Sequence, residues 1–192
     1  SRGLGDVYKR QTEDFIMYFY CKDNGFTLFE LIVTISIISI LSLICIPYYH
    51  NLMQKQELNS IKPLTQQYLS FAKSQALLLH TPVVICSSEN LIQCQNNQWN
   101  SGVVIFTDKN RNKLVDADEH ILFKTEHNIK YGRLTWVGSS SSTHVLTLQG
   151  DTGLPRGAPG GFYYCGISSP ENNIKLNISK MGNIRPEPNR NC

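Results

Sequence analysis

Glu30 has the most unusual chemical setting in this 192-residue chain, because it is the only charged residue between positions 26 and 46. A carboxylate near the end of an apolar helix is costly in lipid, so such a group usually has a partner and a function. Glu30 therefore predicts that this segment does more than anchor the chain in a membrane.

Cysteine is the second residue type that could do chemistry here. Cys21 precedes the apolar run and Cys45 lies within it, which leaves four in the rest of the chain, Cys86, Cys94, Cys165 and Cys192. An even number outside the membrane indicates disulfides, and four cysteines allow three pairings. We favour Cys86–Cys94, which closes a short loop, with Cys165–Cys192, which ties down the C-terminal segment. Zinc is disfavoured because the chain has no C-x-x-C or H-x-x-x-H pattern.

Residues 108–119 have the oxygen-bearing side chains of a calcium loop, namely Asp108, Asn110, Asn112, Asp116 and Glu119. The sixth position, normally glycine, is Lys113, and Lys109 and Arg111 reduce the negative charge. A solvated hairpin loop is the favoured interpretation, calcium is the weaker alternative, and we expect no metal or other cofactor.

Composition excludes several classes of protein. The chain is 41% apolar and 17% charged, which is unlike a disordered chain or a coiled coil. A net charge of +3 disfavours a highly basic nucleic-acid binder. There is no G-x-S-x-G, P-loop or dinucleotide-binding motif, and the five histidines are scattered. We therefore expect no enzymatic activity.

The segment that must position Glu30 is a membrane-spanning helix. Residues 26–49 are apolar at 17 of 24 positions. As a helix, residues 26–46 would span about 31 Å, the thickness of the hydrocarbon core of a bilayer. No small-x-small cleavage site follows the run, so it is retained rather than removed as a secretory signal. Pro47 should kink the helix where it leaves the membrane.

The helix is predicted to continue through residues 50–80, with one apolar stripe that covers a globular domain. Ile61, Leu64 and Tyr68 mark this stripe, and Pro63 should break or kink it. From residue 81 the apolar period becomes strand-like. Seven short strands are expected, at residues 82–86, 103–107, 120–124, 133–137, 143–149, 161–165 and 173–179. The fold class is therefore α+β, with one long helix on a mainly antiparallel sheet.

Residues Gly25-Phe26-Thr27-Leu28-Phe29-Glu30-Leu31 resemble the prepilin cleavage and methylation motif of type IV pilins and type II secretion pseudopilins. The resemblance implies that a prepilin peptidase cuts after Gly25 and methylates the new amine of Phe26. Glu30 becomes the fifth residue of the mature chain and Pro47 the twenty-second. The amine of one subunit would then pair with Glu30 of a neighbour, which would otherwise be left unpaired in an apolar filament core.

The body of the chain resembles the GspH/FimT family of minor pseudopilins, and the fold this implies is pilin-like. The matching segments are Thr81–Cys86, Cys94, Trp99, Gly102–Asn110, Gly153 with Gly157, and Phe162–Cys165. The resemblance implies a single-pass protein of the bacterial inner membrane with a periplasmic C-terminal domain. Its partners would be other pilins or pseudopilins, in a type IV pilus or a type II secretion pseudopilus.

The C-terminal segment resembles the Gly-Arg-x-Arg segment by which FimT-type pilins contact DNA. Gly182 and Arg185 match, whereas Asn183 replaces the first arginine. With Lys180 and Arg190, these residues form a candidate site for sequence-independent DNA binding during DNA uptake. The alternative is a structural pseudopilin for protein export that does not bind DNA.

The expected organisation along the chain follows from these segments. Residues 1–11 resemble the in-frame translation of a sequencing-library adapter and are excluded from the fold. Residues 17–25 form a prepilin leader that starts at Met17. The parts that follow are the membrane half of the helix at 26–49, its amphipathic half at 50–80, and the β domain at 81–192.

Overall fold

The computed structural model describes residues 25–138, 144–156, 160–168, 170–189 and 192. The adapter-like residues, Cys21, Gly157, Arg190 and all of the expected leader except Gly25 lie outside the described residues. Contacts divide the chain into two compact units, with the boundary between Leu43 and Ile44.

Helix α1 runs from Leu28 to Leu79 and contributes to both units. Thr27 begins it, because the Thr27 hydroxyl accepts a hydrogen bond from the N–H of Glu30 (3.2 Å). The helix has one stretch that is long and apolar enough to cross a membrane, and none of that stretch is buried within the protein. The helix assignment continues through Pro47 and Pro63, so the break that Pro63 predicts does not occur.

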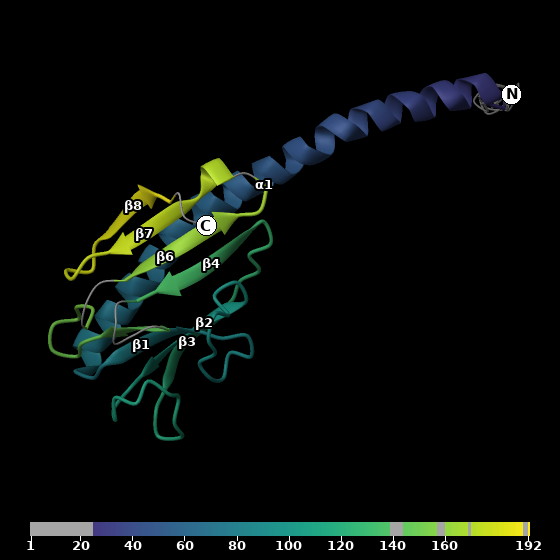
Figure 1. Ribbon diagram of the computed structural model, residues 1–192. Coiled ribbons are helices and arrows are strands. Elements are labelled where there is room, and N and C mark those ends of the chain that lie inside the picture. Colours follow the sequence, from purple (N-terminus) through teal and green to yellow (C-terminus); the bar gives the residue numbers. More distant parts are fainter. Residues whose placement is uncertain (1–24, 139–143, 157–159, 169, 190–191) are drawn as a thin grey trace, which may run out of the picture. The chain divides into compact units, whose positions relative to one another are not determined.

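The C-terminal part of α1 has the expected amphipathic stripe. Its buried residues recur at helical spacing and are Gln54, Ile61, Thr65, Tyr68, Leu69, Ala72 and Ala76. Figure 1 shows this part of the helix running along the strands, and its apolar residues belong to the same core cluster as strand residues Ile85, Ile105 and Leu176.

Among the described residues, eight strands form two antiparallel sheets, rather than the seven strands that the sequence predicts. The first sheet has the order β3-β2-β1-β5, with β1 Val83–Ser87, β2 Gly102–Thr107, β3 Ile121–Glu126 and β5 Val145–Leu148. The second has the order β4-β6-β7-β8, with β4 Gly132–Val137, β6 Gly161–Gly166, β7 Ile174–Ile178 and β8 Ile184–Pro188. A short 3-10 helix, η1 Pro170–Asn172, precedes β7.

Strand β8 is the strand that the sequence prediction missed. It contains Pro186 and Pro188, which cannot donate to a ladder and argue against an interior strand. In the part of the chain that the structure describes, β8 lies at the edge of its sheet and pairs with β7 alone. Because an edge strand leaves one row of backbone groups unpaired, the prolines are tolerated there.

Three strands of the first sheet, β1, β2 and β5, are buried on both faces, whereas edge strand β3 is partly exposed. Alternate residues of β1 and β2 belong to two different core clusters, with Ile85 and Ile105 in the cluster that contains α1 and Val84 and Val104 in a second one. This explains why both strands are continuous apolar runs rather than alternating ones. Leu91, Cys94 and Val115, from the loops that follow β1 and β2, cover the second cluster.

Both favoured disulfides are present in the structure. Cys86 in β1 is joined to Cys94, with their Cα atoms 5.6 Å apart. Cys165 in β6 is joined to Cys192, with their Cα atoms 5.7 Å apart. Cys45 is the free cysteine of the described residues, and it is exposed.

Two polar side chains of α1 hold the helix against the second sheet. The carboxylate of Glu57 accepts hydrogen bonds from the N–H groups of Lys130 (2.8 Å) and Tyr131 (3.2 Å) and from the hydroxyl of Tyr164 (2.8 Å). The side-chain oxygen of fully buried Gln54 accepts one from the N–H of Ser168 (2.9 Å). These bonds fix the position of the helix where apolar packing alone would allow it to slide.

Candidate functional site

The Gly25–Phe26 peptide lies in an open segment before α1. Gly25 is exposed, and a Cβ atom added to it would meet no atom within 4 Å. Phe26 is 76% exposed. The peptide is therefore sterically accessible from within this chain.

Glu30 is the third residue of α1, and its spacing from Thr27 is that of a capping box. A negative charge in the first turn interacts favourably with the partial positive charge of the helix N-terminus. Among the described residues the Glu30 carboxylate has no hydrogen-bond or ion-pair partner in its own chain. The Glu30 carboxylate is therefore available to a partner from outside the chain.

Large apolar side chains flank Glu30 and follow it along α1, and they remain exposed. They include Phe29, Leu31, Ile32, Ile35, Ile38 and Leu41. The hydroxyl groups of Ser36, Ser39 and Ser42, which lie on one stripe of α1, form hydrogen bonds within the helix. Each donates to the backbone carbonyl four residues earlier (2.7–2.8 Å). Pro47 is exposed in the same helix and removes one backbone hydrogen bond there.

The candidate DNA-contacting residues are divided between a turn and a strand. Exposed Lys180 and half-buried Gly182 lie in the β7–β8 turn, where Gly182 has a φ of 77°. Its N–H donates to the carbonyl of Ser179 (2.9 Å). Arg185 follows in β8, is exposed and pairs in register with Asn177. Lys180 and Arg185 are thus both accessible to solvent.

Residues 108–119 form the hairpin loop between β2 and β3, as favoured from the sequence. Asp116 accepts hydrogen bonds from the side-chain amides of Asn110 (2.7 Å) and Asn112 (2.6 Å). Glu119 accepts from the N–H groups of Lys109 (2.8 Å) and Asp116 (3.3 Å). Within the described residues, no three histidine, cysteine or acidic side chains are grouped to hold a metal. Asp108 is buried, at 1% exposure, and one of its carboxylate oxygens has no partner.

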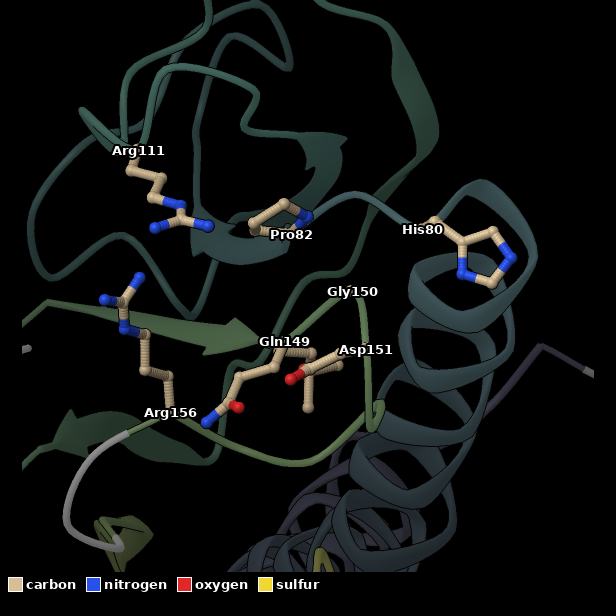
Figure 2. Close-up of a pocket in the computed structure, with 8 residues that line it drawn as sticks. His80, Pro82, Arg111, Gln149, Gly150, Asp151 and Arg156 are labelled. Atoms are coloured by element: carbon tan, nitrogen blue, oxygen red, sulfur yellow. The ribbon is translucent and has the colours of Figure 1, made fainter.

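Sequence reasoning missed a cavity of about 480 Å³ at one end of the first sheet. Its lining residues are His80, Pro82, Arg111, Leu148, Gln149, Gly150, Asp151 and Arg156. Figure 2 shows Arg111 and Arg156 entering from opposite sides, with their guanidinium groups turned toward one another. We call this site the two-arginine cavity. Only tertiary structure brings these arginines together, because they lie 45 positions apart in the chain.

An exposed apolar helix with an acid in its first turn, preceded by an accessible glycine, defines a pilin-like membrane protein. The prokaryotic N-terminal methylation motif matches residues 21–46. Residues 65–182, more than half of the chain, match the family model described as type II transport protein GspH, and the chain belongs to this family. It is therefore a minor pilin or pseudopilin, and both matches are to pilin-type subunits rather than to an enzyme family.

Solved structures of minor pilins and pseudopilins are similar to this chain at low sequence identity. The type IV minor pilin FimU of Pseudomonas aeruginosa is 18% identical, with a TM-score of 0.49 over 71% of this chain and 92% of FimU. The minor pseudopilin EpsH of the Vibrio cholerae type 2 secretion system is 10% identical, with a TM-score of 0.42 over 70% of this chain and 95% of EpsH. No curated protein sequence matches this chain.

Proposed function

We propose that this chain is cut after Gly25, methylated at Phe26, and assembled through α1 into an inner-membrane-based type IV pilus or type II secretion pseudopilus. Its β domain would face the periplasm, and its partners would be a prepilin peptidase and other pilins or pseudopilins. The matches to the methylation motif and the GspH family support this proposal.

The observation that carries the proposal is the position of Glu30. Its carboxylate lies in the first turn of an exposed apolar helix and has no partner among the described residues of its own chain. Cleavage after Gly25 would create an α-amino cation on Phe26, and methylation preserves that charge. Packing such helices side by side excludes water, so the amine of one subunit and Glu30 of its neighbour would each be costly to leave unpaired.

The test is incorporation of a Glu30→Gln variant into filaments in the native host. Because glutamine preserves shape but removes the charge, the variant should be processed like the wild type. It should then fall at least about tenfold in the sheared-filament fraction, as expected when one member of a desolvated ion pair is removed. Ser36→Ala is the matched control, since the Ser36 hydroxyl is bonded to its own helix. Wild-type incorporation of Glu30→Gln would contradict the proposed pairing.

We also propose that the basic C-terminal segment binds DNA without reading its sequence. The supporting observations are the exposure of Lys180 and Arg185 and the excess of basic over acidic residues after position 152, five against two. Phosphate contacts release counterions, so such binding weakens steeply as salt rises.

A gel-shift assay of the full chain in detergent, run at two salt concentrations, tests DNA binding. Replacing Lys180 and Arg185 by glutamine should weaken binding and reduce the salt slope by about two. Absence of binding by the wild type would favour the alternative function, a structural pseudopilin for protein export.

A further inference from the structure

The two arginines of the cavity come from two loops, the one after β5 and the one between β2 and β3. The N–H of Arg156 donates to the carbonyl of Thr147 in β5 (2.8 Å). Arg111 has a φ of 61°, and the Asn110 side chain beside it accepts from the N–H of Asn112 (3.1 Å). Figure 2 shows the two guanidinium groups extending into the cavity from these two loops.

The two facing cations outnumber the one acidic residue among the described residues that line the cavity, Asp151. Among the described residues neither Arg111 nor Arg156 has a carboxylate partner. Asp151 is the acidic residue that lines the cavity, and one of its oxygens accepts hydrogen bonds from the backbone N–H (2.8 Å) and hydroxyl (3.3 Å) of Thr152. Two guanidinium groups that face one another repel. An anion bound between them would be attracted by both, which offsets that repulsion.

Other cations extend the basic surface beyond the cavity. Gly182, in the turn that bears Lys180, lies against the ring of Pro155, which adjoins Arg156. Gly153 packs against the side chain of Lys73 on α1. Lys73 and Lys180 are both exposed. The loop from Gln149 to Arg156 therefore connects the cavity to cations of the helix and of the β7–β8 turn, in an arrangement suited to an extended polyanion rather than to a single ion.

We propose that the two-arginine cavity binds a phosphate group, and that this phosphate belongs to a nucleic-acid backbone. Guanidinium groups suit this role because their planar N–H pairs match phosphate oxygens two at a time. The cavity would hold one phosphate while Lys73 and Lys180 contact its neighbours along the strand. The nucleic-acid source rests on the DNA binding proposed above, whereas the phosphate chemistry of the cavity does not.

The test uses the full chain in detergent with two probes, inorganic phosphate followed by calorimetry and a labelled 20-base-pair duplex followed by fluorescence anisotropy. Arg111→Gln/Arg156→Gln removes the site. Lys124→Gln/Arg133→Gln removes the same charge from exposed positions on β3 and β4. The cavity variant should lose at least about tenfold in affinity for both probes, because hydrogen bonds to charged groups are lost. Its salt slope with DNA should fall by about one, since the cavity holds one phosphate, and the control should keep tight binding.

Each other outcome has a defined meaning. If the wild type binds inorganic phosphate through the two arginines but binds no DNA, the phosphate site stands, and both its nucleic-acid source and the DNA proposal fail. DNA binding that persists in Arg111→Gln/Arg156→Gln but is lost in Lys180→Gln/Arg185→Gln would support the DNA proposal. The same result would contradict the proposal that the cavity binds a DNA phosphate. The phosphate-site proposal also fails if the wild type binds neither probe. It fails too if the control variant loses as much affinity as the cavity variant.

Discussion

The unit that ends at Leu43 and the unit from Ile44 to Cys192 use apolar residues in opposite ways. In the first, the described apolar side chains are almost all exposed, and they follow one another along a single helix. In the second, most apolar residues of α1 and of the two sheets form two buried clusters, although Ile44, Ile46 and Tyr48 near its start stay exposed. The first unit therefore needs lipid or other subunits to cover it, whereas most of the second covers itself. Substitutions should accordingly affect processing and assembly in the first unit and the free energy of unfolding in the second.

The largest expected effect is on processing. Gly25→Leu should abolish cleavage by the prepilin peptidase, because a large side chain would obstruct a peptide that is otherwise open. The thermal unfolding of the unit from Ile44 should not change, since Gly25 lies in the other unit and a Cβ atom added to it would meet no atom within 4 Å. Mass spectrometry and a melting curve of the full chain check both parts. A change in melting temperature would contradict the separation of the two units.

The disulfides should rank by the length of chain that they close. Cys165–Cys192 spans 27 positions and Cys86–Cys94 spans 8. From loop entropy, removing the first by double serine substitution should cost about 3–4 kcal/mol, and removing the second about 2–3 kcal/mol. Urea unfolding of the full chain in detergent measures both. An equal or reversed order would show that local packing dominates over chain entropy.

The two acids of α1 should behave differently under the same substitution. Glu57→Gln weakens the acceptor for two backbone N–H groups and the Tyr164 hydroxyl, and it should cost about 1–3 kcal/mol of unfolding free energy. Glu30→Gln, the matched control, should leave that free energy unchanged. Burial and the contact with Glu57 raise the pKa of Tyr164, so a lower tyrosine pKa in Glu57→Gln would be a second readout. Equal destabilisation by the two substitutions would contradict the comparison.

The smallest expected effect is a pH dependence that comes from His127. Burial lowers the pKa of His127, while its bond to the Trp99 carbonyl opposes that shift. The unfolded chain, with a histidine pKa near 6.5, then binds more protons than the folded one in the interval below that value. Stability should therefore be full above about pH 6.5 and should decrease as pH falls toward the lower folded pKa.

Urea midpoints at pH 7.5 and 5.5 measure this dependence. His127→Gln should flatten it, whereas His144→Gln, at an exposed position, should not. An unchanged dependence in His127→Gln would assign the effect to other groups.

Several elements followed from local sequence because their causes are local. The helix stripe through Ile61 and Tyr68, and seven of the eight strands, were predictable from the period of apolar residues. Strand β8 was not, since tolerance of Pro186 and Pro188 depends on its position at a sheet edge. The continuity of α1 through Pro63 was not predictable either, because packing on both sides of that residue outweighs one missing hydrogen bond.

The same distinction applies to the candidate sites. Gly25, Phe26 and Glu30 lie within six positions, so their residue types and spacing alone indicate the cleavage and assembly segment. In the sequence, Arg111 is only a cation that reduces the negative charge of the calcium-like loop at residues 108–119. Arg156 is only one of the five basic residues after position 152. Their convergence depends on a hairpin loop after β2 and on a loop after β5.

The sequence by itself determined the apolar helix, the single acid in its apolar run, the strand-rich body and the GspH-type character of the chain. Each of these depends on residues close together in the chain, where spacing defines geometry. Tertiary structure decided the division into two sheets, the burial of β1, β2 and β5 on both faces, the contacts of Glu57, and the convergence of Arg111 and Arg156 on one cavity. These depend on which distant segments pack together, and that is set by the burial of shared apolar surface rather than by local spacing.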